Sequence, residues 1–346
     1  GDTNGVYDIF VHDLVTRITE RVSVSSSGGQ LQDNSVSWPG AREPSISWDG
    51  RFVAFETRGS NLVPGDNNGT WDAFVHDRLT GRTERVSVNS AGQERKGPGE
   101  CANVVGCSPL PDQEAGRGTE MNPSISGNGR FVAFRSYASN LVPGDSGINV
   151  DTFVHDRLTH TTERVSVSSS GEEGFDGGSS APGHRQLSFD GRYVAFNSFA
   201  SNLAPGDTGF DPDVFVHDRL TRRTIRISVS SNGDEALVHS DSPTGGATIS
   251  EDGRFVAFHS DAPNLVPGDD NGIVDVFVHD LVTSTTVRVS VTAKGEAMEG
   301  SSSYPYISAD GATVAFHSAS NVPTESFSTN LFVGDQYQVY VNERLR

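Results

Sequence analysis

Five short loops along the chain carry paired carboxylates that could bind a cation. In three of them two aspartates six residues apart flank an Asn-Gly pair, as in Asp66-x-Asn68-Gly69-x-x-Asp72. Calcium takes about six to eight oxygen ligands, which a tight glycine-containing loop can bring together. We therefore predict calcium as a cofactor. The alternative is that these residues only fold the turns through hydrogen bonds to their own backbone. The candidate ligands are Asp2, Asn4, Asp8, Asp66, Asn68, Asp72, Asp145, Asp151, Asp207, Asp211, Asp213, Asp269, Asn271 and Asp275.

A histidine recurs in five copies of an Asp-x-Phe-Val-His-Asp segment. Neighbouring residues on a strand point to opposite faces, so each histidine and the aspartate after it cannot easily join one site. Five copies at equivalent positions also suit packing better than a unique active site. We predict that these histidines are buried and hydrogen-bonded between repeats. They are His12, His76, His155, His217 and His279.

One position varies between repeats while its neighbours stay constant. It follows each Val-Ala-Phe segment and is Glu56, Arg135, Asn197, His259 and His317 in turn. We predict that these five residues bind a ligand in a polar pocket, at the strand ends that face the long loops. Trp38, Tyr137, His184 and Arg185 are expected beside them. Ordinary variation at a strand end is the alternative.

These residues recur because the chain is built from repeats. The Asp-x-Phe segments start at residues 8, 72, 151, 213 and 275, and a worn copy starts at 338, which gives steps of 64, 79, 62, 62 and 63 residues. A fixed period of this size indicates stacked repeats. In the unit 247–291 a short strand, an Asp-Gly turn, a buried strand, a polar loop and two more strands follow one another. Four antiparallel strands per unit are typical of a propeller blade.

The stretch 44–55, Pro-Ser-Ile-Ser-Trp-Asp-Gly-Arg-Phe-Val-Ala-Phe, and the Asp-x-Phe-Val-His-Asp segments resemble the repeats of the TolB-like, WD-repeat-related β-propellers of bacteria. The resemblance covers essentially the whole chain. It implies an all-β β-propeller of four-stranded antiparallel blades in a single domain, 1–346. Blade units are expected at 1–25 with the seam, 44–88, 123–168, 185–231, 247–292 and 306–346, with an insertion at 89–122. We predict six blades; the alternative is five, closed by pairing 306–318 with 8–25.

Composition limits the compartment and the partners. A net charge of -19 and a pI near 4.8 argue against nucleic acid. No apolar run is long enough to span a membrane. The two cysteines, Cys101 and Cys107, lie in the insertion, and a disulfide between them would stabilise the fold by roughly 2 kcal/mol. Such a bond favours an oxidising compartment, so we expect a secreted, cell-surface or periplasmic protein, and the start at Gly1 suggests a processed chain.

Known catalytic patterns are absent from the sequence: it has no Gly-x-Ser-x-Gly, His-Glu-x-x-His or phosphate-binding glycine loop. We therefore predict an extracellular, non-enzymatic binding or structural module with calcium-stabilised rim loops. Its partner would be a protein or a glycan on the loop-rich face. The alternative is a propeller-type polysaccharide lyase or glycoside hydrolase that uses Arg135, His259 and His317. An enzyme would need an acid and a base that converge on one cleft.

Overall fold

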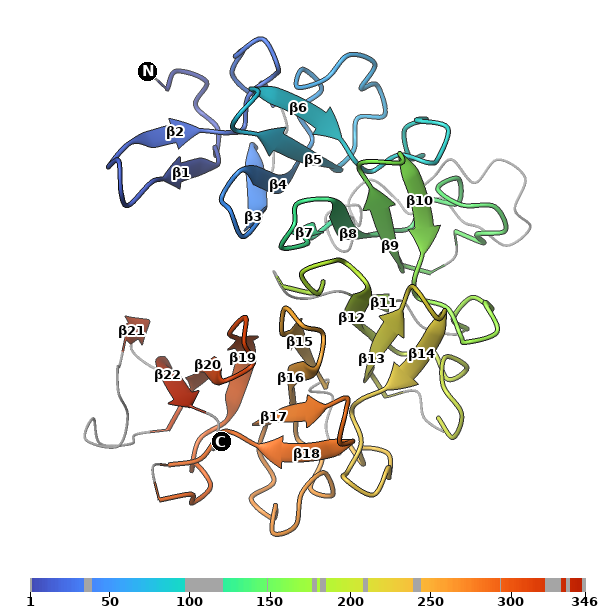
Figure 1. The fold of residues 1–346 in the computed structure, drawn as a ribbon, viewed down its shortest axis with the longest axis vertical. Coiled ribbons are helices and arrows are strands. Elements are labelled where there is room, and N and C mark those ends of the chain that lie inside the picture. Colours follow the sequence, from blue (N-terminus) through green and yellow to red (C-terminus); the bar gives the residue numbers. More distant parts are fainter. Residues whose placement is uncertain are drawn as a thin grey trace. The chain divides into compact units, whose positions relative to one another are not determined.

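The computed structural model describes residues 2–33, 39–96, 121–147, 149–175, 179–180, 185–207, 211–238, 244–292, 294–320, 331–333 and 337–343, the backbone alone at 179–180, 331–333, 337–340 and 342–343. The chain falls into two compact units, Gly1–Val165 and Ser166–Arg346, which are described separately. All regular elements in the described ranges are strands (Figure 1). These ranges contain no helix that is long and apolar enough to cross a membrane.

The first unit contains a two-stranded sheet and two four-stranded sheets, all antiparallel. The two-stranded sheet pairs β1 (Phe10–His12) with β2 (Thr19–Arg21). The next sheet has the order β3 (Ala41–Ile46), β4 (Phe52–Thr57), β5 (Asp72–Asp77), β6 (Arg82–Arg85). The third has the order β7 (Ser124–Ile125), β8 (Phe131–Ser136), β9 (Asp151–Asp156), β10 (Thr161–Arg164).

The second unit contains three four-stranded antiparallel sheets. Their strands are β11 (Ser179–Ser180), β12 (Tyr193–Ser198), β13 (Asp213–Asp218) and β14 (Arg223–Arg226); β15 (Gly245–Ile249), β16 (Phe255–Ser260), β17 (Asp275–Asp280) and β18 (Thr285–Arg288); and β19 (Ser302–Ile307), β20 (Thr313–Ser318), β22 (Tyr337–Glu343) and β21 (Leu331–Val333). In the last sheet the chain order is exchanged, because β22 takes the third place beside β20 and β21 the outer place.

The pattern of apolar residues along each strand explains how far the strand is buried. The second and third strands are apolar on both faces and are covered almost completely, whereas the fourth strands alternate between exposed and buried residues. A phenylalanine of the second strand stacks on one of the third, as Phe55 does on Phe74 with ring centroids 5.9 Å apart. Within a unit, the core of one sheet continues into the next: Phe255 and Val278 of one sheet cluster with Ile307 and Val314 of the following one.

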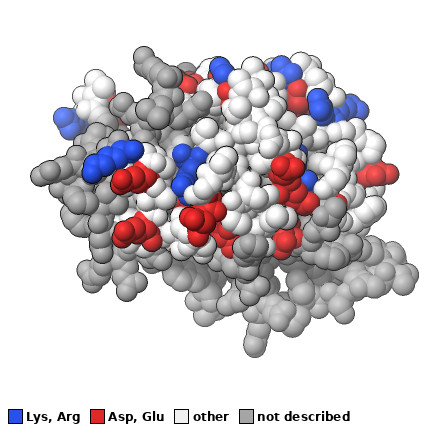
Figure 2. Space-filling view, turned by 90° about the horizontal axis from the view of Figure 1, so that it is seen from below, with Lys and Arg blue, Asp and Glu red and all other residues white. Residues whose placement is uncertain are grey.

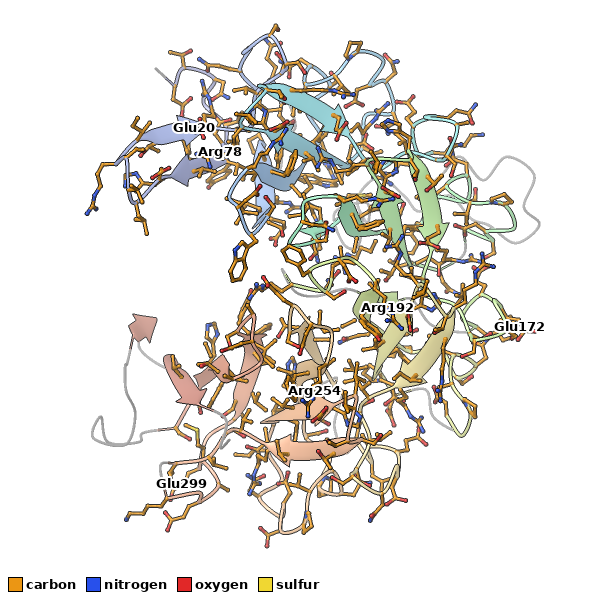
Figure 3. All side chains as sticks on the ribbon, viewed as in Figure 1. Glu20, Arg78, Glu172, Arg192, Arg254 and Glu299 are labelled. Atoms are coloured by element: carbon orange, nitrogen blue, oxygen red, sulfur yellow. The ribbon has the colours of Figure 1, made fainter. Side chains whose placement is uncertain are left out.

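Neighbouring sheets within a unit are tied by hydrogen bonds near both ends of the sheet. Near the inner strands, the backbone N–H of Trp48 donates to the carbonyl of Gly127 at 3.0 Å. Near the outer strands, the hydroxyl of Thr83 donates to the carbonyl of Val24, and Thr162 repeats this contact with Val88. Figure 3 shows a further link, in which Glu20 of β2 lies beside Arg78 of the next sheet and forms an ion pair with it.

The strand pairings confirm the predicted fold class, an all-β β-propeller made of four-stranded antiparallel blades. The worn copy at 338–343 does form a third strand, paired with 313–318. Within 306–318, residues 313–318 therefore pair with β22 rather than with 8–25, unlike the five-bladed alternative. Six blades and a single domain over 1–346 stay predictions.

Candidate functional site

An arginine from the end of the fourth strand faces the two carboxylates of each acidic loop. Nη1 of Arg85 lies 3.0 Å from Asp66 and 3.6 Å from Asp72, and it also contacts Glu94 at 3.1 Å. The other four loops repeat this geometry, with nitrogen–oxygen distances between 2.7 and 3.6 Å. The arginines are Arg21, Arg85, Arg164, Arg226 and Arg288. The predicted ligands do converge, and a guanidinium lies among them.

Most other oxygens of these loops are already hydrogen-bonded. In the loop 66–72 the amide nitrogen of Asn68 donates to Asp72 at 2.8 Å, while its amide oxygen accepts from the backbone of Thr70 at 3.1 Å. The hydroxyl of Ser87 donates to the second oxygen of Asp72. Asn4 and Asn271 make the same contacts with Asp8 and Asp275. Turn formation, the alternative to metal binding, is therefore observed in these loops.

Burial perturbs the loop carboxylates. It raises the pKa of Asp66 and of Asp213 to about 7 and that of Asp269 to about 6, against the opposing effect of the arginine. The carboxylates of Asp207, Asp213 and Glu235 bring ligand atoms within 4.8 Å of one another, a spacing that could hold a metal ion. Asp211, also a predicted ligand, is exposed and not in this cluster. Calcium stays a prediction, in competition with the arginine.

Replacing Arg226 with glutamine tests whether a calcium ion can take the place of the arginine side chain among these carboxylates. The variant leaves three clustered carboxylates without their counter-charge, so we expect it to lose about 3 kcal/mol or more of unfolding free energy without calcium. Millimolar calcium should restore part of this loss, because an ion bound only by the folded state stabilises it. Arg223→Gln, which replaces an exposed arginine on the same strand, is the control. For this control and for the unmodified chain, the unfolding temperature in calcium should equal that in chelator.

A drop in the midpoint of the unmodified chain on chelation would instead place calcium in the loops beside the arginine. If calcium leaves Arg226→Gln unchanged, the cluster takes no metal.

The recurrent histidines are structural, as predicted. Nδ1 of His76 lies 2.8 Å from Oγ1 of Thr83, directly opposite on the neighbouring strand, and the pair recurs in all five copies. The Thr83 proton goes to the carbonyl of Val24, so Nδ1 must be the donor. Burial lowers the pKa of His155 and of His279 to about 4. The prediction is wrong on two points: His12 is exposed, and the partner belongs to the same sheet.

The repeat-breaking position has a structural role in the first unit. Glu56 is fully buried and accepts hydrogen bonds from Nε of Arg42 at 2.8 Å and from the backbone N–H groups of Met121 and Asn122 at 2.5 and 2.9 Å. Its pKa is raised by burial. Arg135 is half-buried at the same place in the next sheet, where its backbone N–H donates to the carbonyl of Met121. Glu56 thus binds the chain itself, and a role in ligand binding stays a prediction.

In the second unit the same position builds a polar and aromatic cluster, which we call the loop-side cluster: Asn197, Gly245, Gly246, His259, Tyr304 and His317. Tyr304 lies between the two imidazoles, with its ring centroid 5.8 Å from each. Gly245 and Gly246 run past Asn197 and His259, where a Cβ at Gly245 would come within 2.9 Å of the Asn197 amide nitrogen. Three of the five predicted ligand-binding residues therefore meet in one place.

Two buried polar atoms of the loop-side cluster lack a hydrogen-bond partner among the residues that the structure describes. The amide of Asn197 donates to the carbonyl of Thr244 at 3.2 Å, but its oxygen is unpaired, and so is Nδ1 of His259. Asn197 is only 5% exposed. Each unpaired buried group costs about 1–3 kcal/mol. Burial also lowers the pKa of His259 to about 4, so its imidazole is neutral at pH 7.

Tyr304 is exposed and held in an unusual backbone conformation. It is 60% exposed, with φ at 52° in a bulge of β19. The bulge of the preceding inner strand places Gly246 there, with φ at 66°. A non-glycine residue in this region costs about 1–2 kcal/mol. Sequence analysis missed Tyr304, because its side chain joins the cluster only through the bulge.

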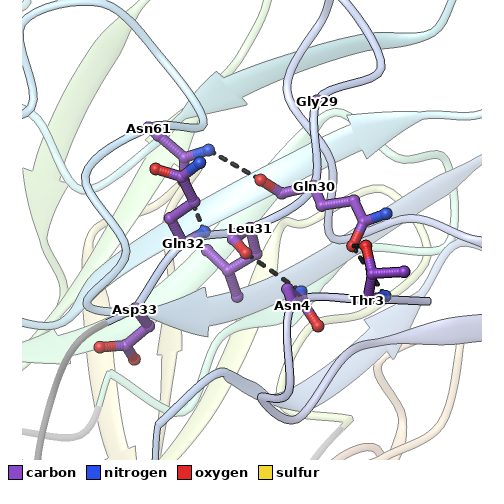
Figure 4. A pocket seen from close by; sticks show the side chains of 8 residues that line it. All are labelled: Thr3, Asn4, Gly29, Gln30, Leu31, Gln32, Asp33 and Asn61. Atoms are coloured by element: carbon purple, nitrogen blue, oxygen red, sulfur yellow. Dashed lines mark hydrogen bonds between the residues drawn. The ribbon is translucent and has the colours of Figure 1, made fainter.

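A separate pocket in the first unit has a volume of about 410 Å³ and lies between the N-terminal loop and the segment 29–33 (Figure 4). Its groups are bonded to one another: Asn4 donates to the carbonyl of Leu31 at 3.0 Å and Asn61 to that of Gln30 at 2.8 Å. The Asn61 contact recurs at Asn140, Asn202 and Asn264. This pocket is therefore a feature of the repeat.

The remaining predicted residues do not join the cluster. Arg185 contacts the carbonyl of Ile307 and the carboxylate of Glu251, in the hairpin turn at the opposite end of the strands. Trp38 and His184 lie outside the described residues, as do Cys101 and Cys107 with their predicted disulfide. On the face seen in Figure 2, acidic and basic side chains are interspersed.

No protein-family model matches the chain, and no curated protein matches its sequence. Among solved structures, one assigned to TolB from Agrobacterium tumefaciens is 14% identical, with 97% of this chain and 84% of that chain covered and a TM-score of 0.48. TolB from Acinetobacter baumannii is 16% identical, with 98% and 60% covered and a TM-score of 0.45, so the chain spans less than two thirds of it.

The β-propeller domain of the Trilobed protease from Pyrococcus furiosus is 10% identical, with 88% and 68% covered and a TM-score of 0.44. These values are too low to carry an argument about function, and the fold follows from the strand pairings described above. By those pairings the chain has a β-propeller fold, and the structures it resembles include TolB, as its repeats predicted.

Proposed function

We propose that the chain is a non-enzymatic binding module that recognises a protein or a glycan at the loop-side cluster. One observation carries the proposal: the Asn197 oxygen and His259 Nδ1 are buried without a partner among the described residues, and the exposed ring of Tyr304 lies 5.8 Å from the imidazole of His259. Unpaired buried groups lower the stability of a fold. Such features persist where a ligand uses them.

The chemistry of the cluster favours an uncharged ligand with hydroxyl groups. None of its side chains is a carboxylate, lysine or arginine, and the imidazole of His259 is neutral at pH 7. The Asn197 oxygen needs a donor, while a neutral imidazole nitrogen can accept or donate according to its tautomer. A sugar hydroxyl can do both, and the flat face of Tyr304 offers an apolar platform for a sugar ring. A neutral glycan therefore fits better than an acidic one, which the net charge of -19 would also repel.

The enzymatic alternative lacks its acid–base pair in this cluster. Among the described residues, neither His259 nor His317 is hydrogen-bonded to a carboxylate. Arg135 belongs to the other compact unit. Secretion or a periplasmic location remains part of the proposal and rests on the predicted cysteine pair. Calcium binding by the rim carboxylates is a separate proposal: the arginine neutralises them in the unmodified chain, and the Arg226→Gln experiment above tests whether an ion can take its place.

Replacing Tyr304 with glycine tests the binding proposal without unfolding the sheet. Gly246 occupies the same bulge position one sheet earlier, so the variant should fold with a stability equal to or slightly above that of the parent. Binding, screened on arrays of neutral oligosaccharides, acidic oligosaccharides and peptides and then measured by calorimetry, should weaken roughly tenfold or more. Trp48→Ser, which removes an equally exposed aromatic from a hairpin turn, is the control and should leave affinity unchanged.

Equal affinity of Tyr304→Gly and the parent for every ligand found would move the binding site elsewhere. Turnover of an oligosaccharide that stops in His259→Ala would establish the enzymatic alternative instead.

A further inference from the structure

One hairpin of the first unit carries two histidines side by side. His155 lies in β9 and His160 in the turn between β9 and β10, and their ring centroids are 6.4 Å apart. His160 is exposed, and its backbone is left-handed with φ at 57°. The equivalent turn residues of the other repeats are Arg17, Gly81, Arg222 and Ser284. The pair is therefore particular to this hairpin and is not prescribed by the repeat.

His155 presents a ring nitrogen that can accept a metal ion. Its Nδ1 lies 2.9 Å from Oγ1 of Thr162, whose own proton goes to the carbonyl of Val88. Nδ1 must then carry the hydrogen, which leaves a lone pair on Nε2. No described residue forms a hydrogen bond with Nε2, although His155 is only 3% exposed. Metal-binding histidines have this arrangement, in which a hydrogen bond to one nitrogen orients the other toward the ion.

A carboxylate of the preceding sheet lies close to His155. Oε1 of Glu84 accepts a hydrogen bond from Nε of Arg157 at 2.6 Å, and Arg157 follows His155 by two residues. Burial lowers the pKa of His155 to about 4, and the charge of Glu84 opposes that shift. Oε2 of Glu84 pairs with the exposed Arg82 at 3.5 Å, a contact that solvent weakens. One carboxylate oxygen thus holds Arg157 while the other can take a further cation.

Two imidazole nitrogens and a carboxylate oxygen are a donor set that suits zinc. Zn²⁺ binds such ligands tetrahedrally, with imidazole nitrogens about 2.0–2.1 Å away, which sets two bound rings about 5 Å apart between centroids. Because His160 is exposed, its ring can rotate to close the difference from 6.4 Å, whereas Thr162 fixes the ring of His155. A metal ligand must be neutral imidazole, and burial keeps His155 in that form at pH 7.

We propose that His155, His160 and Glu84 bind one zinc ion, with water in the fourth position. Nε2 of His155, an imidazole nitrogen of His160 and Oε2 of Glu84 are its ligands, and Oε1 of Glu84 keeps its hydrogen bond from Arg157. Three protein ligands and an open position distinguish this site from a closed structural one. Its nitrogen donors also distinguish it from the acidic loops, whose oxygens suit calcium.

The first test titrates the full chain with Zn²⁺ by calorimetry. We expect one saturable site, whose affinity falls roughly tenfold or more in His160→Gln and in Glu84→Gln. His160 is an exposed turn residue, so its replacement leaves the fold intact. His12→Gln is the control: it removes another exposed histidine, with Arg17 in its turn, and should leave zinc affinity unchanged. Excess Mg²⁺ should not displace the zinc, because it prefers oxygen ligands.

The second test builds the site where the repeat lacks it. In the preceding hairpin His76 and Glu20 stand where the proposed site has its buried histidine and its carboxylate, so Gly81→His should take a second zinc ion. Ser284→His is the matched variant without a carboxylate, because Ile225 stands in its place, and should bind its added ion more weakly. The backbone of both turns is left-handed, as in the parent hairpin.

Nitrogen resonances of the imidazoles give a readout that does not depend on affinity. Zinc should shift Nε2 of His155, while Nδ1 stays protonated and bound to Thr162. Zinc affinity that is unchanged in His160→Gln, or a zinc-bound chain in which Nε2 of His155 does not shift, would overturn the proposal and assign the ion to the acidic loops. The absence of saturable zinc binding would also overturn it. A Gly81→His variant that still takes one ion would overturn the three-residue geometry.

Discussion

Phe258→Ala is expected to lower the unfolding free energy by about 3–5 kcal/mol, whereas Phe10→Ala should cost about 1 kcal/mol or less. Phe258 is fully buried and stacks on Phe277 at 5.7 Å, so its truncation leaves a cavity in the core of the sheet. Phe10, the counterpart of Phe277 in the first repeat, is half exposed, so little buried area is lost. Urea unfolding followed by tryptophan fluorescence and by circular dichroism measures both.

Equal losses for the two phenylalanines would show that the β1 edge is covered in solution, because only a buried ring can cost as much as Phe258.

A second matched pair isolates the contact between neighbouring sheets. Gly253 and Gly50 occupy equivalent hairpin turns, with φ at 73° and 70°, so an alanine suffers the same backbone penalty of about 1–2 kcal/mol at both. Only at Gly253 would the new Cβ overlap the ring of Tyr193. We therefore expect Gly253→Ala to lose about 2–5 kcal/mol in all and Gly50→Ala only the backbone part.

Thermal and urea unfolding of the two alanine variants give the difference directly. A Gly50→Ala variant as unstable as Gly253→Ala would mean that a bulky group already lies against Gly50.

The fold could be predicted from sequence because its determinants are local and repeated. The Asp-Gly turn at 252–253, the apolar strand after it and the Asp-x-Phe-Val-His-Asp strand each specify their own conformation. The segments recur in four further copies, so uncertainty about the strand or turn in one copy is resolved by the others. Only 338–343, where the motif is worn, needed the structure to show that it still pairs as a third strand.

The role of the acidic loops was only half predictable. The sequence pattern identified the aspartates, but the cation predicted beside them was a calcium ion rather than a side chain of the chain itself. An arginine follows the second aspartate by 13 residues in all five repeats, as in Asp72 and Arg85, so the signal was present in the sequence. What spacing alone could not give is that the fourth strand returns this arginine to the loop.

The loop-side cluster was predictable in part for a different reason. Variation at one position singled out Asn197, His259 and His317. Their unpaired atoms, however, depend on Gly245 and Gly246, which pass close to both side chains, and on a bulge that turns Tyr304 outward. These are distances between segments up to about a hundred residues apart, and no local pattern encodes them.

The ties between neighbouring sheets have a consequence for how such a chain can change. Each hydroxyl-to-carbonyl link, glycine-on-ring contact and turn-to-turn hydrogen bond joins one sheet only to the next. Duplicating or deleting a whole segment of about 62 residues would therefore recreate the same junctions with new neighbours, whereas inserting a single residue inside a strand would invert its faces. Length in this protein can evolve in units of one sheet.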